Sequence, residues 1–103
     1  MCPHITSHAN KRLKHRARLR GEEKRKVVER ACRNGISQAD TETGSDLQRY
    51  LAALYFKYRT ANNVRIYGRY VYLFDRWHLI TVLNLPEGFW PVADEIMREK
   101  RRA

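Results

Sequence analysis

The sequence predicts an α+β domain with about three amino-terminal helices, a small antiparallel sheet after them, and a carboxyl-terminal helix. Two patterns carry this prediction. Up to about residue 60 the apolar residues recur every three or four positions, as on one face of a helix. Residues 64–84 are instead rich in β-branched and aromatic residues, which favour strands. At 103 residues the chain is long enough for one modest core, so we expect a single domain over residues 1–103.

The first two predicted helices share a basic region, residues 1–35. Thr6 or Ser7 offers a hydroxyl that can cap the first helix, which we expect to begin near His8. Gly21 interrupts this helix, and a second one is expected from about residue 22 to residue 33. Between residues 11 and 33 the chain holds eleven Lys or Arg and only three Glu. This imbalance predicts a basic face rather than a uniformly basic surface.

The strongest helical pattern lies in residues 45–60, which we expect to form a core helix. It follows residues 36–44, a predicted loop of small and acidic residues. Ser45 or Asp46 can cap the helix. Its aromatic and aliphatic side chains recur at three- and four-residue spacings, which indicates a face packed on the core. The residues of this face are Leu47, Tyr50, Leu51, Leu54, Tyr55 and Tyr58.

Residues 64–84 predict three short strands. Gly68 and Arg69 form a two-residue connection suited to a tight hairpin turn. Because parallel strands need crossovers of about a dozen residues or more, and the connections here are shorter, we expect an antiparallel meander. The strands are expected at residues 64–67, 70–74 and 78–83. In one assignment of the alternation, the residues that share a face are Arg65, Tyr67, Tyr70, Tyr72 and Thr81.

The carboxyl-terminal helical tail is expected in residues 89–103. Trp90 and Pro91 can open a helix that runs to about residue 101. The basic residues 100–102 suit the carboxyl end of a helix dipole and equally suit a nucleic-acid contact. The apolar side chains of the tail either cover the sheet or make a dimer contact, so monomer and homodimer both stay open. These side chains are Phe89, Trp90, Ile96 and Met97.

The formal net charge of +10 is most simply explained by a polyanionic partner, RNA or another nucleic acid. The alternative is a basic surface that only keeps a small protein soluble. Cys2 lies near the start of the chain and Cys32 on an apolar helix face, so we expect no disulfide framework and a reducing compartment. No run approaches the roughly 18 apolar residues of a membrane span. We therefore expect a cytoplasmic protein without membrane contact.

Three residues of the first helix have the side chains that metal-independent phosphodiester cleavage requires. His8, Arg12 and Arg16 are four residues apart and so share one helix face. Imidazole groups transfer protons near neutral pH, and guanidinium groups bind phosphate oxygens through paired donors. The alternative is a helix-start histidine beside a solvated face. Thr81 is a further candidate, because a hydroxyl on an apolar strand either bonds the backbone or faces a functional surface.

Other basic and aromatic residues are candidates for nucleic-acid binding. A tyrosine of the sheet can stack on an unpaired base, although core tyrosines give the same pattern. The binding candidates are Lys11, Lys14, His15, Arg18, Arg20, Arg65 and Tyr67. We expect no metal, since Pro3 places His4 ahead of the helix that holds His8 and so breaks up a ligand pair. Without a phosphate loop or a Ser, His and Asp motif, nucleotide hydrolysis and acyl transfer have no support in the sequence. We also expect no cofactor.

Two segments resemble a known family. The stretch I-T-S-H-A-N-K-R-L-K-H-R, residues 5–16, resembles the I-T-x-H-A-x-x-R-x-x-x-R start of RelE-like small ribonucleases of the Barnase, EndoU, colicin and RelE superfamily. The strand L-I-T-V, residues 79–82, resembles the L-I-T-V or L-V-T-V ending common there. The resemblance implies metal-independent RNA cleavage by attack of the ribose 2′-hydroxyl, which leaves a cyclic phosphate. It implies His8 as acid or base, Arg12 and Arg16 as phosphate clamps, and Thr81 as a polar contact.

Two functions follow from the sequence. The favoured one is a small cytoplasmic endoribonuclease of toxin type, which acts on mRNA or another RNA and has a cognate antitoxin as a candidate partner. The alternative is a non-enzymatic nucleic-acid-binding protein of a phage or mobile element that inhibits a nucleic-acid enzyme, such as an RNA-guided nuclease (anti-CRISPR-like). The feature that discriminates the enzyme is the pairing in space of His8 with Thr81.

Overall fold

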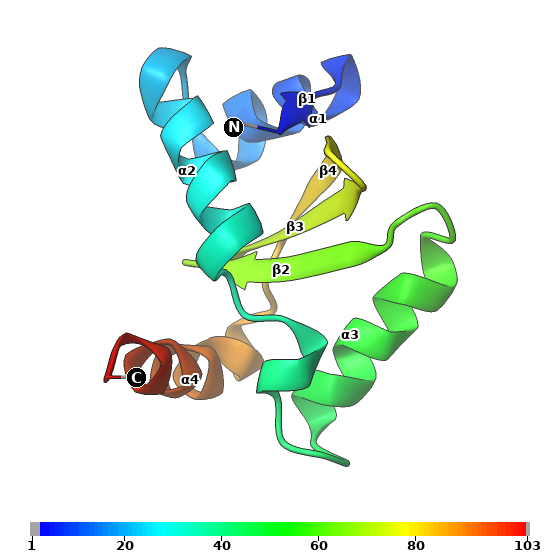
Figure 1. The fold of residues 1–103 in the computed structure, drawn as a ribbon, viewed down its shortest axis with the longest axis vertical. Coiled ribbons are helices and arrows are strands. Elements are labelled where there is room, and N and C mark those ends of the chain that lie inside the picture. Colours follow the sequence, from blue (N-terminus) through cyan, green and yellow to red (C-terminus); the bar gives the residue numbers. More distant parts are fainter. Residues whose placement is uncertain (1–2, 103) are drawn as a thin grey trace.

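A four-stranded sheet separates two layers of helices in the computed structural model, which describes residues 3–102 (Figure 1). Helices α1 Ser7–Arg12 and α2 Gly21–Asn34 pack on one face of the sheet. Helices α3 Asp46–Lys57 and α4 Trp90–Arg102 cover the other face. The predicted α+β class, with helices before the sheet and one after it, is confirmed.

Three strands form the predicted antiparallel meander. They are β2 Asn63–Tyr67, β3 Tyr70–Asp75 and β4 His78–Asn84, in the order β4-β3-β2. Gly68 opens the β2–β3 turn at a φ of 64°, a conformation that glycine adopts without strain. Each strand begins or ends within one or two residues of its predicted position.

A fourth strand makes the sheet mixed, so the expectation of a purely antiparallel sheet was wrong. The short strand β1 His4–Ile5 pairs in parallel with β4, His4 beside His78 and Ile5 beside Leu79. A parallel pair needs a long connection, and here residues 6–77 provide it. The links inside residues 64–84 are too short for a parallel pair, but β1 precedes them and reaches β4 through this longer connection.

The first helix ends differently from the prediction. Thr6 caps it by accepting a hydrogen bond from the backbone N–H of Ala9 at 3.2 Å, so α1 begins at Ser7. After α1 the chain continues as a π-helical turn, η1 Leu13–Ala17. The break comes at Arg18, with a φ of 55°, rather than at the predicted Gly21, which is instead the first residue of α2.

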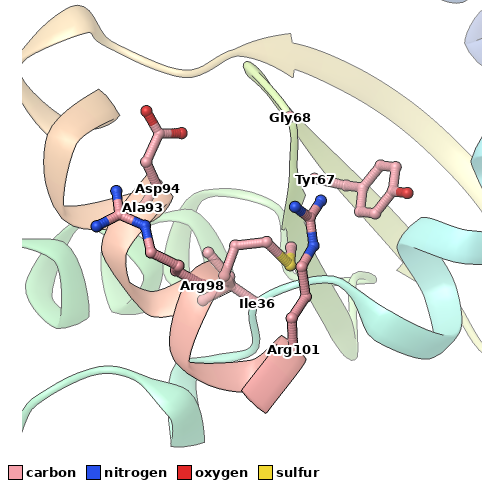
Figure 2. Close-up of a pocket in the computed structure, with 8 residues that line it drawn as sticks. Ile36, Tyr67, Gly68, Ala93, Asp94, Arg98 and Arg101 are labelled. Atoms are coloured by element: carbon pink, nitrogen blue, oxygen red, sulfur yellow. The ribbon is translucent and has the colours of Figure 1, made fainter.

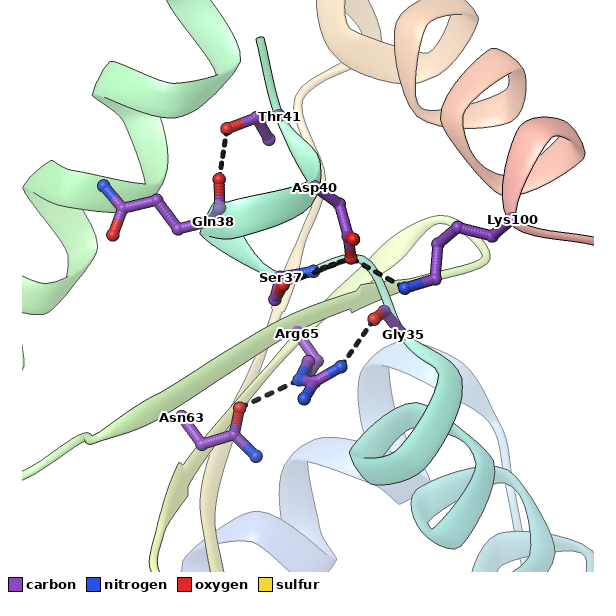
Figure 3. Close-up of polar contacts among 8 residues, drawn as sticks. All are labelled: Gly35, Ser37, Gln38, Asp40, Thr41, Asn63, Arg65 and Lys100. Carbon is purple, nitrogen blue, oxygen red and sulfur yellow. Dashed lines mark hydrogen bonds and ion pairs between the residues drawn. The ribbon is translucent and has the colours of Figure 1, made fainter. Parts of the chain in front are cut away.

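The predicted loop at residues 36–44 is tied to the sheet and to α4. Ile36 is buried and forms a two-way backbone bridge with Ile66 of β2, with N to O distances of 2.8 and 2.9 Å. In the 3-10 turn η2 Gln38–Asp40, the Asp40 carboxylate accepts hydrogen bonds from the Ser37 N–H at 2.9 Å and from Lys100 Nζ of α4 at 2.7 Å (Figure 3). The segment therefore connects the sheet to α4.

The sheet divides the apolar core into two clusters. The cluster under α1 and α2 contains Ala9, Leu13, Val28, Ala31, Tyr72, Phe74, Leu79 and Val82. The other cluster is built on α3, and the apolar side chains of the tail pack against it, so they cover the sheet. These tail residues are Phe89, Trp90, Ile96 and Met97. Full burial of one such large side chain stabilises the fold by about 1.5–3 kcal/mol. Of the two cysteines considered for a disulfide, Cys2 lies outside the described residues.

Candidate active site

One cleft brings together all four residues that the sequence nominated for catalysis. Its volume is about 330 Å³, and it lies between the first helix and β4. Tyr58, the residue that ends α3, also contributes to it. We call this hollow the His8 cleft. Its lining residues are His8, Arg12, Arg16, Tyr58, Ile80, Thr81 and Leu83.

Hydrogen bonds to β4 align the first helix with this strand. The backbone N–H and the hydroxyl of Thr6 both donate to the carbonyl of Leu79, at 3.2 and 2.9 Å. Ten residues further along, Arg16 Nη1 donates to the carbonyl of Val82 at 3.2 Å. His8 and Arg12 lie between these two bonded residues in the sequence, and they share the helix face of Arg16 because residues four apart lie on one face. The basic stripe therefore follows the strand.

The imidazole of His8 lies beside two cations. Arg12 Nε donates a long hydrogen bond of 3.4 Å to His8 Nε2. His8 is exposed, whereas Arg12 and Arg16 are half-buried. The hydroxyl of Tyr70 donates to the backbone carbonyl of Arg16 at 3.0 Å and so fixes the end of η1. The cleft thus combines an exposed imidazole with two half-buried guanidinium groups, of which Arg16 is bound to β4.

Thr81 presents a hydroxyl to the same cleft. The residue is only 6% exposed, yet its hydroxyl bonds no other residue of the part of the chain that the structure describes. No buried side-chain oxygen among those residues lacks a partner, so the hydroxyl oxygen reaches the solvent of the cleft. Of the two alternatives for this hydroxyl, the backbone bond is not made among the described residues, and the functional surface stays a prediction.

The register corrects one expectation about the sheet faces. Arg65 pairs with Tyr72, and Tyr67 with Tyr70, so these four residues do share a face. Thr81 instead pairs with Leu73 and lies on the opposite face, because a bulge between Leu73 and Phe74 shifts the pairing. Bulges re-aim side chains in this way, commonly next to active sites.

The predicted binding residues of the first helix surround the stripe without lining the cleft. All five are exposed, so the cations of the four Lys and Arg residues are open to a polyanion. They are Lys11, Lys14, His15, Arg18 and Arg20.

Arg65 and Tyr67 lie elsewhere. Arg65 donates to the Gly35 carbonyl at 2.8 Å and to the Asn63 side chain at 2.9 Å (Figure 3), so its guanidinium joins the end of α2 to β2. Arg65 therefore has a structural role, and its assignment as a nucleic-acid contact stays a prediction. Tyr67 lines a different hollow, beside α4.

Tyr58 is the cleft residue that sequence reasoning assigned to the core. It is half-buried, and the ammonium of Lys57 lies 5.6 Å from its ring centre. Its place at the very end of the apolar face of α3 is the one sequence signal that distinguishes it from Leu51 or Leu54. A side chain at a helix end covers less of the core than one in the middle.

Within residues 3–102, no cluster of three or more His, Cys, Asp or Glu is arranged to hold a metal ion. No helix in that range is both long enough and apolar enough to cross a bilayer. Neither a protein-family model, nor a curated protein, nor a solved structure matches the chain at a significant level. The resemblance to RelE-like ribonucleases therefore rests on the residues of the two motifs alone.

Proposed function

We propose that the protein is a metal-independent endoribonuclease that cleaves RNA in the His8 cleft and acts in the cytoplasm, with an antitoxin as its partner. The observation that carries the proposal is the convergence of His8, Arg12 and Arg16 with Thr81 on one hollow of about 330 Å³. A proton-transfer group, two cations and a hydroxyl are the groups needed at a reacting phosphodiester.

In the proposed reaction, His8 takes the proton of the ribose 2′-hydroxyl. The 2′-oxygen then bonds to the adjacent phosphorus, and the bond from phosphorus to the 5′-oxygen breaks. The leaving 5′-oxygen takes a proton from His8 or from water, which the exposed position of His8 admits. The products are a 2′,3′-cyclic phosphate and a 5′-hydroxyl, and no metal is required for any of these transfers.

Arg12 and Arg16 supply the fixed positive charge. The phosphorane gains negative charge as it forms, and donors already in position stabilise this charge without reorganising. One nitrogen of Arg16 is bound to Val82, which restrains the group and leaves its other donors for phosphate oxygens. The Thr81 hydroxyl, which has no partner among the described residues, serves as a further donor to the phosphate.

The test is cleavage of end-labelled RNA in excess chelator by the wild type, by His8→Ala and by a control, His4→Ala. His4 is an exposed histidine that does not line the cleft. Loss of the general base is expected to lower the rate at least about 100-fold. The control is expected to keep the wild-type rate within about threefold, with a cyclic phosphate on the product.

Equal rates for the wild type and His8→Ala would refute the assignment of His8. RNA binding by the wild type without any turnover would refute the enzyme and favour the non-enzymatic binding protein.

A further inference from the structure

A second basic hollow lies between α2, the β2–β3 turn and α4. It consists of two adjoining cavities of about 400 and 390 Å³, which share Tyr67, Met97 and Arg101. Figure 2 shows residues that line the first of them. We call it the Tyr67 groove. None of its lining residues belongs to the His8 cleft, so the two hollows are separate sites.

The Tyr67 groove carries uncompensated positive charge. Arg30, Arg98 and Arg101 are exposed, and their guanidinium groups make no hydrogen bond or ion pair with any other residue in the described range 3–102. The acid in the lining, Asp94, is already paired with Arg69 at 3.1 Å. Three guanidinium groups therefore remain for an anion, and guanidinium forks suit phosphate oxygens in particular.

An aromatic ring accompanies these cations. Tyr67 is half-buried against the cluster under α1 and α2, which fixes its ring. The guanidinium of Arg101 extends from α4 toward this ring, as Figure 2 shows. The Tyr67 hydroxyl bonds no residue among those described, so its outer end is open. Proteins that bind single-stranded nucleic acid commonly stack its bases on aromatic rings and pair its phosphates with nearby cations.

The sheet places the Tyr67 groove next to the end of the basic stripe. Tyr67 pairs with Tyr70, and Tyr70 pairs with Asn84 of β4. The Tyr70 hydroxyl also bonds the carbonyl of Arg16, the last residue of the stripe. Because neighbouring strands are about 5 Å apart, Tyr67 lies about 10 Å across the sheet from β4. A few nucleotides of extended chain span that distance.

We propose that the Tyr67 groove binds single-stranded RNA outside the cleavage point, with an unpaired base stacked on Tyr67 and phosphates at Arg98 and Arg101. The inference rests on the proposed function, since it places the scissile phosphate in the His8 cleft. It adds a substrate class, because a base inside a duplex has no free face for the ring. Duplex RNA is therefore a poor ligand.

The experiment measures binding by fluorescence anisotropy in the His8→Ala background, with a labelled single-stranded RNA of about 12 nucleotides and the matching duplex. The groove variant is Arg98→Gln with Arg101→Gln. A matched control, Arg49→Gln with Arg76→Gln, removes the same charge from two exposed residues outside both hollows. The groove variant is expected to bind the single strand about tenfold more weakly, with a salt slope smaller by about 1.4. The control is expected to change binding less than about threefold.

Two substitutions of Tyr67 test the role of its ring separately from the arginines. Tyr67→Leu is expected to weaken single-strand binding about tenfold, and Tyr67→Phe is expected to retain it, because stacking needs the ring and not the hydroxyl. Unchanged binding in both the arginine pair and Tyr67→Leu would overturn the inference. Equal affinity for the duplex, or for a polyglutamate peptide bound through the same residues, would also overturn it.

Failure of this inference is distinguishable from failure of the proposed function. Cleavage by the wild type together with normal binding by the groove variants overturns only the groove. Weakened binding by those variants without any cleavage by the wild type overturns only the enzyme.

Discussion

The His8 cleft and the Tyr67 groove are both basic, but different interactions hold them in place. The cleft is anchored by hydrogen bonds to backbone carbonyls, from Thr6 to Leu79, from Arg16 to Val82 and from Tyr70 to Arg16. None of these bonds involves a carboxylate. The geometry of the cleft therefore does not depend on the protonation of an acid.

The groove is framed by ion pairs instead. Asp94 pairs with Arg69 from the turn, and Asp40 pairs with Lys100 on α4. These pairs are partly exposed, so salt screens them and acid removes their negative partners. The comparison contrasts a cleft held by hydrogen bonds that involve no carboxylate with a groove whose frame depends on salt and pH.

The largest difference in RNA-cleavage kinetics is expected between two double variants that each lose two positive charges. Arg12→Gln with Arg16→Gln removes the charge facing the phosphorane, so kcat should fall at least about 100-fold. Arg98→Gln with Arg101→Gln should instead raise KM about tenfold, because groove contacts are the same in ground and transition states. Steady-state kinetics on one RNA checks both. An equal loss of kcat in the two variants would remove the distinction between the sites.

A smaller difference, in the free energy of unfolding, is expected between variants of the two paired tyrosines of the β2–β3 hairpin. Tyr70→Phe removes the hydrogen bond to Arg16 and should destabilise the fold by about 1 kcal/mol. Tyr67→Phe removes a hydroxyl without a partner among residues 3–102 and should cost less than about 0.5 kcal/mol. Urea unfolding of both variants measures the difference. Equal stabilities would show that the Tyr70 bond contributes nothing to anchoring the stripe.

The smallest effect on the free energy of unfolding is expected from the substitution of Asp40, and this effect should depend on pH. Burial by itself raises the pKa of Asp40, but hydrogen bonds from Lys100 and Ser37 outweigh it and hold the pKa below its ordinary value of 3.8. Because the pKa of Asp40 is lower in the folded state than in the unfolded state, its carboxylate stabilises the fold at pH values above the unfolded-state pKa. That stabilisation is lost as the pH falls through the folded-state pKa. Asp40→Asn should therefore cost up to about 1 kcal/mol at neutral pH and progressively less below about pH 4.

Urea unfolding at several pH values tests this expectation, with Glu42→Gln as the control. Glu42 is an exposed acid of the same segment, and its substitution should cost less than about 0.5 kcal/mol. A loss in Asp40→Asn that stays constant down to pH 3 would contradict the role of the carboxylate charge.

Much of the fold could be predicted because the signals were local. The cap at Ser45, the periodic apolar face of α3 and the turn at Gly68 each depend on a few consecutive residues. Strand β1 and the bridge at Ile36 could not be predicted in this way. Each is one or two residues long, and each is defined by a partner distant in sequence, Leu79 in one case and Ile66 in the other.

In the candidate site too, features set by a few consecutive residues were predictable, whereas features set by distant segments were not. The shared face of His8, Arg12 and Arg16 follows from helical geometry, and their proximity to Thr81 was expected from the two motifs. The Tyr67 groove was not foreseen, because it depends on how α4 docks beside the hairpin. The burial that raises the pKa of Tyr72, with Tyr70 and Tyr67 adding to it, likewise arises only when the layers pack together.

The bond from Arg16 to Val82 has a consequence for self-association. Beyond Leu79, β4 has a paired strand on one side only, so within the described chain its other side is a sheet edge without a strand, beside the first helix. Exposed edges recruit strands from other molecules, and charged groups at the edge oppose this aggregation. A guanidinium seated on the Val82 carbonyl occupies one acceptor that an incoming strand would need. The side chain proposed to hold phosphate thus also makes this part of β4 a poorer template for an incoming strand.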